Sequence, residues 1–495
     1  MAARNSKQKW GRILVVLVAL LALGGWLAWW KLFREVPQAL ADDSMEEYFK
    51  YGSIGTEEQD GIPFWIWLVL PKMFPEYLPA PGGWAALGFG WEQGHDLPVG
   101  FSKRTIGFER VGVNCALCHS GTLRKVADGV PTIYPGAPGT SVDVLGYQRF
   151  LFRSAADPRF TPDNILGEIA QVYELSLIDR LLYRYILIPA TKKALLKQAG
   201  QFAWTNHRPD WGRGRIDPFN PVKERVLRVD AGDTIGNSDM QSIWNLEPRV
   251  ERGMALHWDG LNTDLREVVL SSAIGDGTLP DALPVARLVA LEDWLKTLPP
   301  PRFEARFAVD AALAATGAEV YQAHCARCHA MDGEKTGQVL TLDDPEWADA
   351  GSDSRGLPPH TDAHRAEMWT PEAAAAYNAY AADFPWTFNK FRSTGGYVNV
   401  PLDGLWLRAP YLHNGSVPYL SDLLEPPARR TKVFYRGFDV YDPIRVGFIS
   451  EGADAERRGW RLDTSIAGNS NQGHLWGTDL GPEEKQALIE YLKTL

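Results

Sequence analysis

The sequence is short of cysteine and, over most of its length, of positive charge. Its 495 residues contain four cysteines, all inside two pentapeptides, so no cysteine is left over. The net charge is −10, and because the first 34 residues hold six basic residues and no acid, the rest of the chain carries −16. An acidic body disfavours nucleic-acid binding. A composition of 45% apolar and 23% charged residues is that of a globular protein, which excludes a largely disordered chain.

One long uncharged run lies near the N-terminus. Residues 13–30 carry no charge, and 18 helical residues extend about 27 Å, which is enough to cross a bilayer core. Four basic residues precede the run and keep the N-terminus cytoplasmic by the positive-inside rule. Residues 1–34 are therefore predicted to anchor a single-pass inner-membrane protein whose body lies in the periplasm. The alternative is a signal peptide cleaved at the small residues Ala39 and Ala41, although a charged stretch separates them from the run.

The two cysteine pentapeptides both have the form C-x-x-C-H. One spans Cys115, Cys118 and His119, and the other spans Cys325, Cys328 and His329. This pattern attaches a c-type haem: two thiols bond to the porphyrin and the adjacent histidine becomes an axial iron ligand. A zinc site or a redox dithiol would also use a cysteine pair, but neither explains a histidine in both copies. The sequence therefore predicts two covalently bound c-type haems, each with one iron.

An internal repeat indicates a duplicated unit. The segment 291–298 recurs almost unchanged as 488–495, and each copy follows a C-x-x-C-H motif at a similar distance. Three prolines at 299–301 separate the copies. We expect a mainly α fold with two cytochrome c-like domains, 35–298 and 302–495, which carry long loop insertions and follow one transmembrane helix.

Two further segments have clear patterns. Residues 160–206 have the periodicity of helices. We expect an amphipathic helix whose apolar face is buried, and the alternative is that its basic residues contact lipid headgroups. The apolar run 64–70 is too short to span a bilayer and is predicted to pack in the core.

The remaining histidines bear on the sixth coordination position of each iron, because a second strong ligand makes an electron carrier and a vacancy admits peroxide or dioxygen. Besides His119 and His329 there are eight, and most are expected to be ordinary surface or core residues. His474 stands out because it lies in a glycine-rich loop within a segment that only the second copy has. Taken alone, a surface loop histidine is the simpler interpretation.

Four segments occur in a characteristic order: Val113–His119, Leu256–Gly260, Arg408–Ser416 and Asn471–Gly477. Together they resemble the di-haem family of bacterial cytochrome c peroxidases and methylamine-dehydrogenase-maturating enzymes, and most closely its rubber-oxygenase branch. The resemblance implies that His474 is the second ligand of the C-terminal haem and that the N-terminal haem is the reactive one. It also implies that Trp258 is an electron bridge between the haems. The reactive iron is expected in a pocket near 271–274, with Ser272 and Ile274 on its wall.

The sequence departs from the classical peroxidases of this family in two ways. No histidine occurs between His119 and His207 to cap the resting N-terminal haem, which favours a vacant iron there. The acidic residue that assists peroxide cleavage has no clear counterpart; Glu267 is nearest, and an exposed helix glutamate is its expected role.

These observations predict a redox enzyme that activates peroxide or dioxygen, with electrons relayed by the C-terminal haem. The alternative is a non-catalytic electron-transfer cytochrome between a dehydrogenase and a terminal oxidase. Either needs a redox partner protein, such as a small cytochrome, a cupredoxin or a membrane dehydrogenase, and neither involves nucleic acid.

Overall fold

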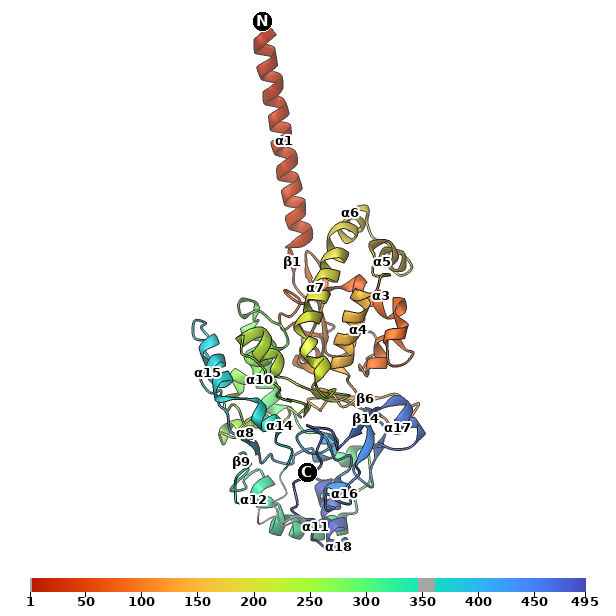
Figure 1. Cartoon of the computed structure of the whole chain (residues 1–495), viewed down its shortest axis with the longest axis vertical. Coiled ribbons are helices and arrows are strands. Elements are labelled where there is room, and N and C mark those ends of the chain that lie inside the picture. Colours follow the sequence, from red (N-terminus) through yellow and green to blue (C-terminus); the bar gives the residue numbers. More distant parts are fainter. Residues whose placement is uncertain (1, 346–360) are drawn as a thin grey trace.

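The computed structural model describes residues 2–345 and 361–495; His360, among the histidines of unassigned role, lies outside them. Helix α1 (Ala2–Leu32) projects from a body in which the rest of the chain is folded (Figure 1). Its residues Trp10–Leu32 are long and apolar enough to cross a membrane, with a mean hydropathy of 2.3. A signal sequence near an N-terminus has the same properties.

Helices are the longest regular elements of the body, while each strand has six residues or fewer. The longer helices are α2 (Met45–Tyr51), α3 (Phe64–Met73), α4 (Val144–Ala156), α5 (Pro162–Ile169), α6 (Leu177–Leu182), α7 (Ile188–Gln201), α9 (Leu265–Gly275), α10 (Val285–Thr297), α11 (Ala311–His324), α15 (Pro371–Tyr380), α17 (Ala453–Arg458) and α18 (Pro482–Leu492). Shorter ones are α8 (Glu247–Glu251), α12 (Ala326–His329), α14 (His364–Met368) and α16 (Leu420–Leu423). Long connections join these elements, as the sequence predicts.

The strands form small antiparallel sheets. The largest has the order β1-β3-β4-β2, with β1 (Glu35–Val36), β3 (Phe101–Ile106), β4 (Phe108–Val113) and β2 (Ile62–Pro63). The two-stranded sheets pair β5 (Ser120–Leu123) with β6 (Thr132–Pro135), β7 (Arg215–Ile216) with β8 (Ser238–Asp239), β9 (Val339–Thr341) with β10 (Gly396–Val398), β11 (Val433–Arg436) with β14 (Trp460–Asp463), and β12 (Tyr441–Asp442) with β13 (Gly447–Phe448).

Helix α1 joins the body without a spacer. Strand β1 begins three residues after α1 ends and pairs with β3. At the β3–β4 turn, Gly107 has a φ of +74° and lies so close to the backbone of Leu32 that a Cβ there would overlap it. The body therefore follows the apolar helix directly, with two residues between α1 and β1.

The first part of the body has an aromatic core. Helix α3 contributes Phe64, Trp67 and Leu70 to this core, which confirms the prediction for residues 64–70. Trp67 stacks on Trp84 at a ring-centre distance of 4.6 Å, and Tyr147 on α4 packs against both. Helices α5, α6 and α7 cover this core, and the helical pattern predicted for 160–206 is present.

Both copies of the sequence repeat lie in helices. Segment 291–298 falls in α10, which ends at Thr297, and segment 488–495 falls in α18, which ends at Leu492. Helix α18 crosses α11 closely at Gly317, where a Cβ would overlap the carbonyl oxygen of Ala487. In the first copy, α10 packs on α2 through Trp294 and Phe49, whose ring centres are 5.3 Å apart.

The hydrophobic core does not divide at the predicted boundary near residue 300. Trp369 and Tyr377, from α14–α15 in the second copy, share one core cluster with Leu270 and Ile274 of α9 in the first. The Tyr377 hydroxyl also donates to the backbone oxygen of Ser271 at 3.1 Å. The division into units 35–298 and 302–495 stays a prediction. The hydrophobic core that the structure shows contains residues from both sides of this boundary.

Candidate functional site

Each C-x-x-C-H motif forms a helical turn that directs its cysteines and histidine to one side. The amide of His119 donates to the carbonyl of Cys115 at 3.1 Å, and that of His329 donates to Cys325 at 3.0 Å. Asn114 precedes the first motif, here a single turn η3 (Cys115–Leu117), and accepts a hydrogen bond from the amide of Ala116 at 3.0 Å. The turns explain why this spacing is needed, since residues three and four apart lie on one face of a helix.

Each motif opens onto its own cavity. The first cavity has a volume of about 370 Å³, and its lining includes Cys115, Cys118 and His119. The second has about 220 Å³, and its lining includes Cys325, Cys328, His329 and His474.

The histidines of the two motifs are held in the same way. His119 Nδ1 bonds to the backbone oxygen of Gln241 at 2.8 Å, and His329 Nδ1 bonds to that of Val400, also at 2.8 Å. A ring fixed through Nδ1 keeps Nε2 for a metal. Burial lowers the pKa of both rings, which favours the neutral, ligating form.

His474 faces His329 across the second cavity. Their ring centres are 6.1 Å apart, with the ring planes tilted by 36°. Two imidazoles on opposite sides of one metal ion, each with a bond of about 2.0 Å and a ring centre about 1.1 Å behind the nitrogen, have centres about 6 Å apart. Burial lowers the pKa of His474 to about 3, so its ring is neutral. The spacing and charge state therefore suit two axial ligands of one iron.

A buried arginine fixes the loop of His474. The guanidinium of Arg430 is 2% exposed and donates to the backbone oxygens of Asn471, Gly473 and His474 at 2.7–2.8 Å. His474 itself has a φ of +46°, which an L-residue rarely adopts. The arginine thus holds a strained backbone in the conformation that turns the imidazole into the cavity.

Trp258 lies between the two cavities and contributes to the walls of both. Its Nε1 donates to the backbone oxygen of Asp239 at 2.8 Å, two residues before the Gln241 carbonyl that holds His119. Its own backbone oxygen accepts from the amide of Val398 at 2.9 Å, two residues before the carbonyl that holds His329. Short hydrogen-bonded segments therefore link both motif histidines to this one tryptophan.

Helix α9 supplies one wall of the first cavity, but not through every residue expected there. Ser271 and Ser272 line the cavity, whereas Ile274 is 3% exposed and packs in the core with Leu270. The reason is helical geometry, because Val268 and Ser272, four residues apart, share the cavity face and Ile274 points away. Ile274 is therefore corrected to a core residue.

Glu267 is not the exposed helix residue that the sequence suggests. It is 5% exposed and accepts hydrogen bonds from the amides of Asn389 and Lys390 and from Asn262. These contacts are structural, since they fix a loop of the second copy against α9.

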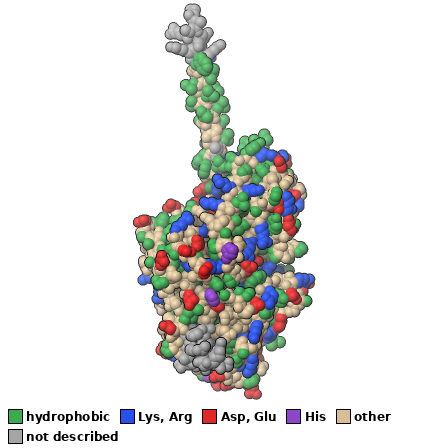
Figure 2. Space-filling view, viewed as in Figure 1, with side chains coloured by type: hydrophobic (Ala, Val, Ile, Leu, Met, Phe, Trp, Pro, Cys, Tyr) green, Lys and Arg blue, Asp and Glu red, His purple; other side chains and the backbone are tan. Residues whose placement is uncertain are grey.

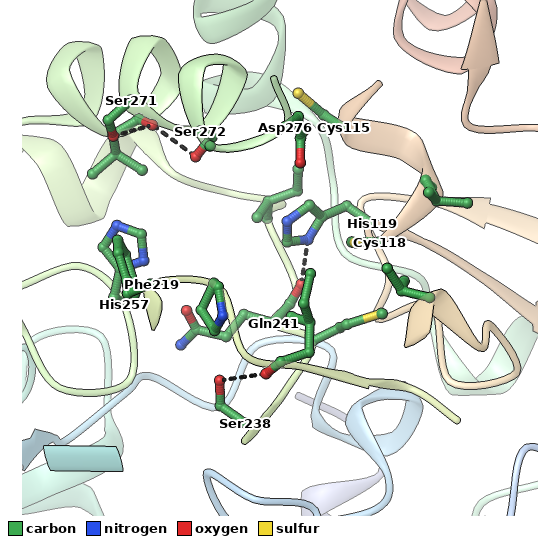
Figure 3. Close-up of a pocket in the computed structure, with 18 of the residues that line it drawn as sticks. Cys115, Cys118, His119, Phe219, Ser238, Gln241, His257, Ser271, Ser272 and Asp276 are labelled. Atoms are coloured by element: carbon green, nitrogen blue, oxygen red, sulfur yellow. Dashed lines mark hydrogen bonds between the residues drawn. The ribbon is translucent and has the colours of Figure 1, made fainter. Parts of the chain in front are cut away.

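One acid that does line the first cavity is Asp276, just after α9. It lies beside Cys115 (Figure 3), and burial alone raises its pKa to about 7. Sequence reasoning missed it because one aspartate at a helix end is usually a cap or a surface residue.

His257 is a second missed residue of this cavity. Its ring lies across the cavity from His119 (Figure 3) and packs edge-on against Phe219, with ring centres 5.4 Å apart. Nε2 is buried without a hydrogen-bond partner, and the φ of the residue is +66°. Burial lowers its pKa to about 3, so the ring is a neutral base or ligand. Its position next to Trp258 is the only sequence signal that would have indicated it.

Arg365 also faces the first cavity with unused donors. It is 2% exposed, pairs with Asp259 at 3.1 Å, and has Nε and Nη1 without partners. A buried cation with free donors suits an anion, and a c-type haem carries two carboxylates. The residues of this cavity therefore fit a haem.

Other chemistries fit the motifs less well. Among the described residues no group of three or more His, Cys, Asp or Glu side chains is arranged to hold a metal ion, which disfavours zinc. None of the four cysteines forms a disulfide, and burial raises the pKa of Cys115 to about 12 and that of Cys325 to about 11. A redox dithiol needs a lowered thiol pKa.

Comparison with known sequences places cytochrome c in the second half of the chain. A cytochrome c family model matches residues 314–389, and a model described as RoxA-like, cytochrome c-like matches residues 396–435. An uncharacterized protein, y4iJ, of Sinorhizobium fredii (strain NBRC 101917 / NGR234) is 26% identical over 479 residues, which covers 78% of this chain and 77% of the relative. Another from the same organism, y4iM, is 31% identical over 310 residues, covering 52% of this chain and 64% of the relative. The chain is thus cytochrome c-like with a RoxA-like part, and such sequence implies a covalently bound haem; the C-x-x-C pair Cys325 and Cys328 lies within the matched residues.

Proposed function

We propose that this protein is a membrane-anchored di-haem c-type cytochrome with its body in the periplasm. In this proposal the N-terminal haem activates peroxide or dioxygen and the C-terminal haem relays electrons to it. The observation that carries the proposal is the difference between the cavities. The second has His474 facing His329 at a two-ligand spacing, whereas the larger first cavity has no ring pair of that kind among the described residues.

The residues of the second site suit electron transfer. His329 and His474 would hold the iron of a haem bound there, and Arg430 keeps His474 in place. A fixed ligand set leaves no position for an external ligand and needs little rearrangement when the charge on the iron changes. Trp258 then couples this site to the first, because its hydrogen bonds reach the segments that hold both His119 and His329.

The residues of the first site suit chemistry. A haem held by Cys115, Cys118 and His119 would supply an iron able to bind an external ligand. Asp276, with a pKa of about 7, can give or take a proton near neutral pH inside the cavity. His257 offers a neutral nitrogen in the same cavity, and Arg365 offers unused donors for a carboxylate.

His257 also supports the alternative function. If its Nε2 were the second ligand of the N-terminal iron, neither haem would be open and the protein would be an electron-transfer cytochrome. Under either function the acidic body needs a redox partner protein, for which a small cytochrome, a cupredoxin or a membrane dehydrogenase are the candidates.

A rapid-mixing experiment separates the two functions. The reduced protein is mixed with hydrogen peroxide or with dioxygen while the haem absorbance is followed. If the protein is an enzyme with an open iron, its haems should be reoxidised almost as fast as the solutions are mixed. If it is a carrier with two closed irons, both oxidants should react with it slowly. Slow reoxidation by both oxidants would contradict the proposed enzyme.

The same experiment tests the bridge. In Trp258→Phe, reoxidation of the C-terminal haem should slow by about tenfold or more, while cyanide binding to the N-terminal haem stays unchanged. Trp84→Phe is the control for a tryptophan-to-phenylalanine change, because Trp84 is 5% exposed and packs in the aromatic core of the first part of the body, away from Trp258. Equal rates in the two variants would remove the bridge from the proposal.

A further inference from the structure

The helical segment that begins with α6 is apolar on both of its sides. Leu182, Tyr183 and Leu187 point into the core of the first part of the body. The opposite side exposes a second apolar set, which we call the α6 surface. It consists of Leu177 (74% exposed), Ile178 (54%), Leu181 (48%), Tyr185 (70%) and Ile186 (47%). Asp179, Arg180 and Arg184 lie among these residues, so the surface is amphipathic, and a cluster of exposed large apolar residues marks a contact surface.

The α6 surface lies beside the base of α1. Lys31, in the last turn of α1, forms an ion pair with Asp179 of α6 at 2.6 Å. Figure 1 shows the tip of α6 reaching past the end of α1 where α1 meets the body. Because Gly107 packs on Leu32 and β1 pairs with β3 directly after α1, the position of this end is fixed relative to the body.

The base of α1 has the composition of a membrane–water interface. Trp26, Trp29 and Trp30 are all exposed there, and the guanidinium of Arg34 lies 3.6 Å from the ring centre of Trp30. Tryptophans and basic residues gather at the level of lipid headgroups. Figure 2 shows hydrophobic side chains along α1 and again at the adjoining end of the body, with basic side chains among them.

We propose that the α6 surface inserts into the headgroup–acyl boundary of the bilayer that α1 spans, so that the body rests on the membrane in one orientation. This inference rests on the proposed membrane anchorage of α1. If α1 spans the bilayer and no spacer follows it, the residues around Lys31 lie at the interface. The Lys31–Asp179 ion pair then brings the α6 surface to the same level. Its apolar side chains, with Tyr185 as an amphipathic member, are those of an interfacial helix.

Depth measurements on the full haem-loaded chain, one copy per lipid nanodisc, test this contact. A nitroxide is attached through a genetically encoded ketone amino acid at Ile178 or Tyr185, so that the haem cysteines are left alone. Collision with dioxygen, which concentrates in lipid, is compared with collision with a water-soluble nickel complex. Leu20, within α1, reports on the anchor, and Ile444, 80% exposed in the second half of the chain, is the matched water-exposed control.

We expect the labels at Ile178 and Tyr185 to favour dioxygen over nickel severalfold, as the label at Leu20 does, and the label at Ile444 to favour nickel. Adding Leu181→Glu should move the label at Tyr185 toward water, while Ile444→Glu should not. If Leu20 is in lipid but Ile178 and Tyr185 resemble Ile444, the contact is wrong and the anchor stands. Water-like accessibility at all sites would overturn both. Labels at Ile178 shielded from both reagents would also overturn the proposal, because a protein would then cover the surface.

Discussion

At the residue scale, the second cavity depends on two imidazoles and one guanidinium. His329 is fixed by a carbonyl through Nδ1, and His474 is fixed through its backbone by Arg430. The two are held by separate parts of the chain, so the ring spacing of 6.1 Å reflects the fold and not a local motif.

His474→Ala should convert the low-spin C-terminal haem to a high-spin or water-ligated form, because a strong-field nitrogen is lost. His413→Ala is the matched control. His413 also lines the second cavity with a buried ring, but it stacks on Tyr397 at 4.0 Å instead of facing His329. Electronic and EPR spectra measure the spin state. A change in the His413 variant and none in the His474 variant would exchange their roles.

Asp276→Asn should change how stability depends on pH. A carboxyl with a folded-state pKa near 7, against about 4 when unfolded, keeps its proton in the folded protein while the unfolded chain loses it. The free energy of unfolding should therefore fall as the pH rises from about 4 to 7, by on the order of 2–4 kcal/mol, and then level off.

The Asp276→Asn variant should lack this fall. The Tm of the variant minus the Tm of the natural protein should therefore increase between pH 5 and pH 8. Thermal unfolding followed by circular dichroism measures it. The exposed Asp281→Asn is the control and should show no such trend. A Tm difference for Asp276→Asn that is constant with pH would show that the carboxyl is not buried as described.

The sequence predicts some of these residues and not others for a physical reason. Thioether attachment requires a fixed spacing, so the two C-x-x-C-H motifs can be read directly, and His474 could be reached through the resemblance of its loop. Asp276 and Arg430 act through burial and long-range contacts, which no local pattern records. Ile274 was misplaced because its neighbours face the cavity, and a single position in a helix changes the side that a residue faces.

At the scale of the element, the close crossing of α11 and α18 holds the turn with Cys325 against the closing helix. Gly317 makes the crossing possible, and Tyr321 and Tyr491 continue it with ring centres 5.0 Å apart. The repeated closing helices could be predicted because each carries its own periodicity. The packing of α14–α15 on α9 could not, because it joins segments about 100 residues apart and leaves no signal in either.

Gly317→Ala should destabilise the protein by about 1–3 kcal/mol, since a methyl group overlaps the backbone of α18 and the helices must separate. Gly200→Ala in α7 is the matched control, because a Cβ there meets nothing within 4 Å. Removing that glycine from a helix should stabilise the protein by up to about 1 kcal/mol. Denaturant unfolding monitored by circular dichroism compares them; equal effects would show that α11 and α18 do not cross at Gly317.

At the scale of the whole molecule, Trp258 lines both cavities, and the core that runs across residue 300 fixes their relative position. In the proposed function, this arrangement separates an electron-storing site from a reacting site. If α1 spans a bilayer as proposed, helix α1 and the α6 surface set the orientation of both sites relative to it.

The most direct test of this account is the EPR spectrum of the purified, resting ferric protein, before and after addition of cyanide. We predict one low-spin signal, absent in Cys325→Ser/Cys328→Ser, and one high-spin signal that cyanide removes while shifting about half of the haem absorbance. Two low-spin signals that resist cyanide would contradict the open N-terminal iron and leave an electron-transfer cytochrome.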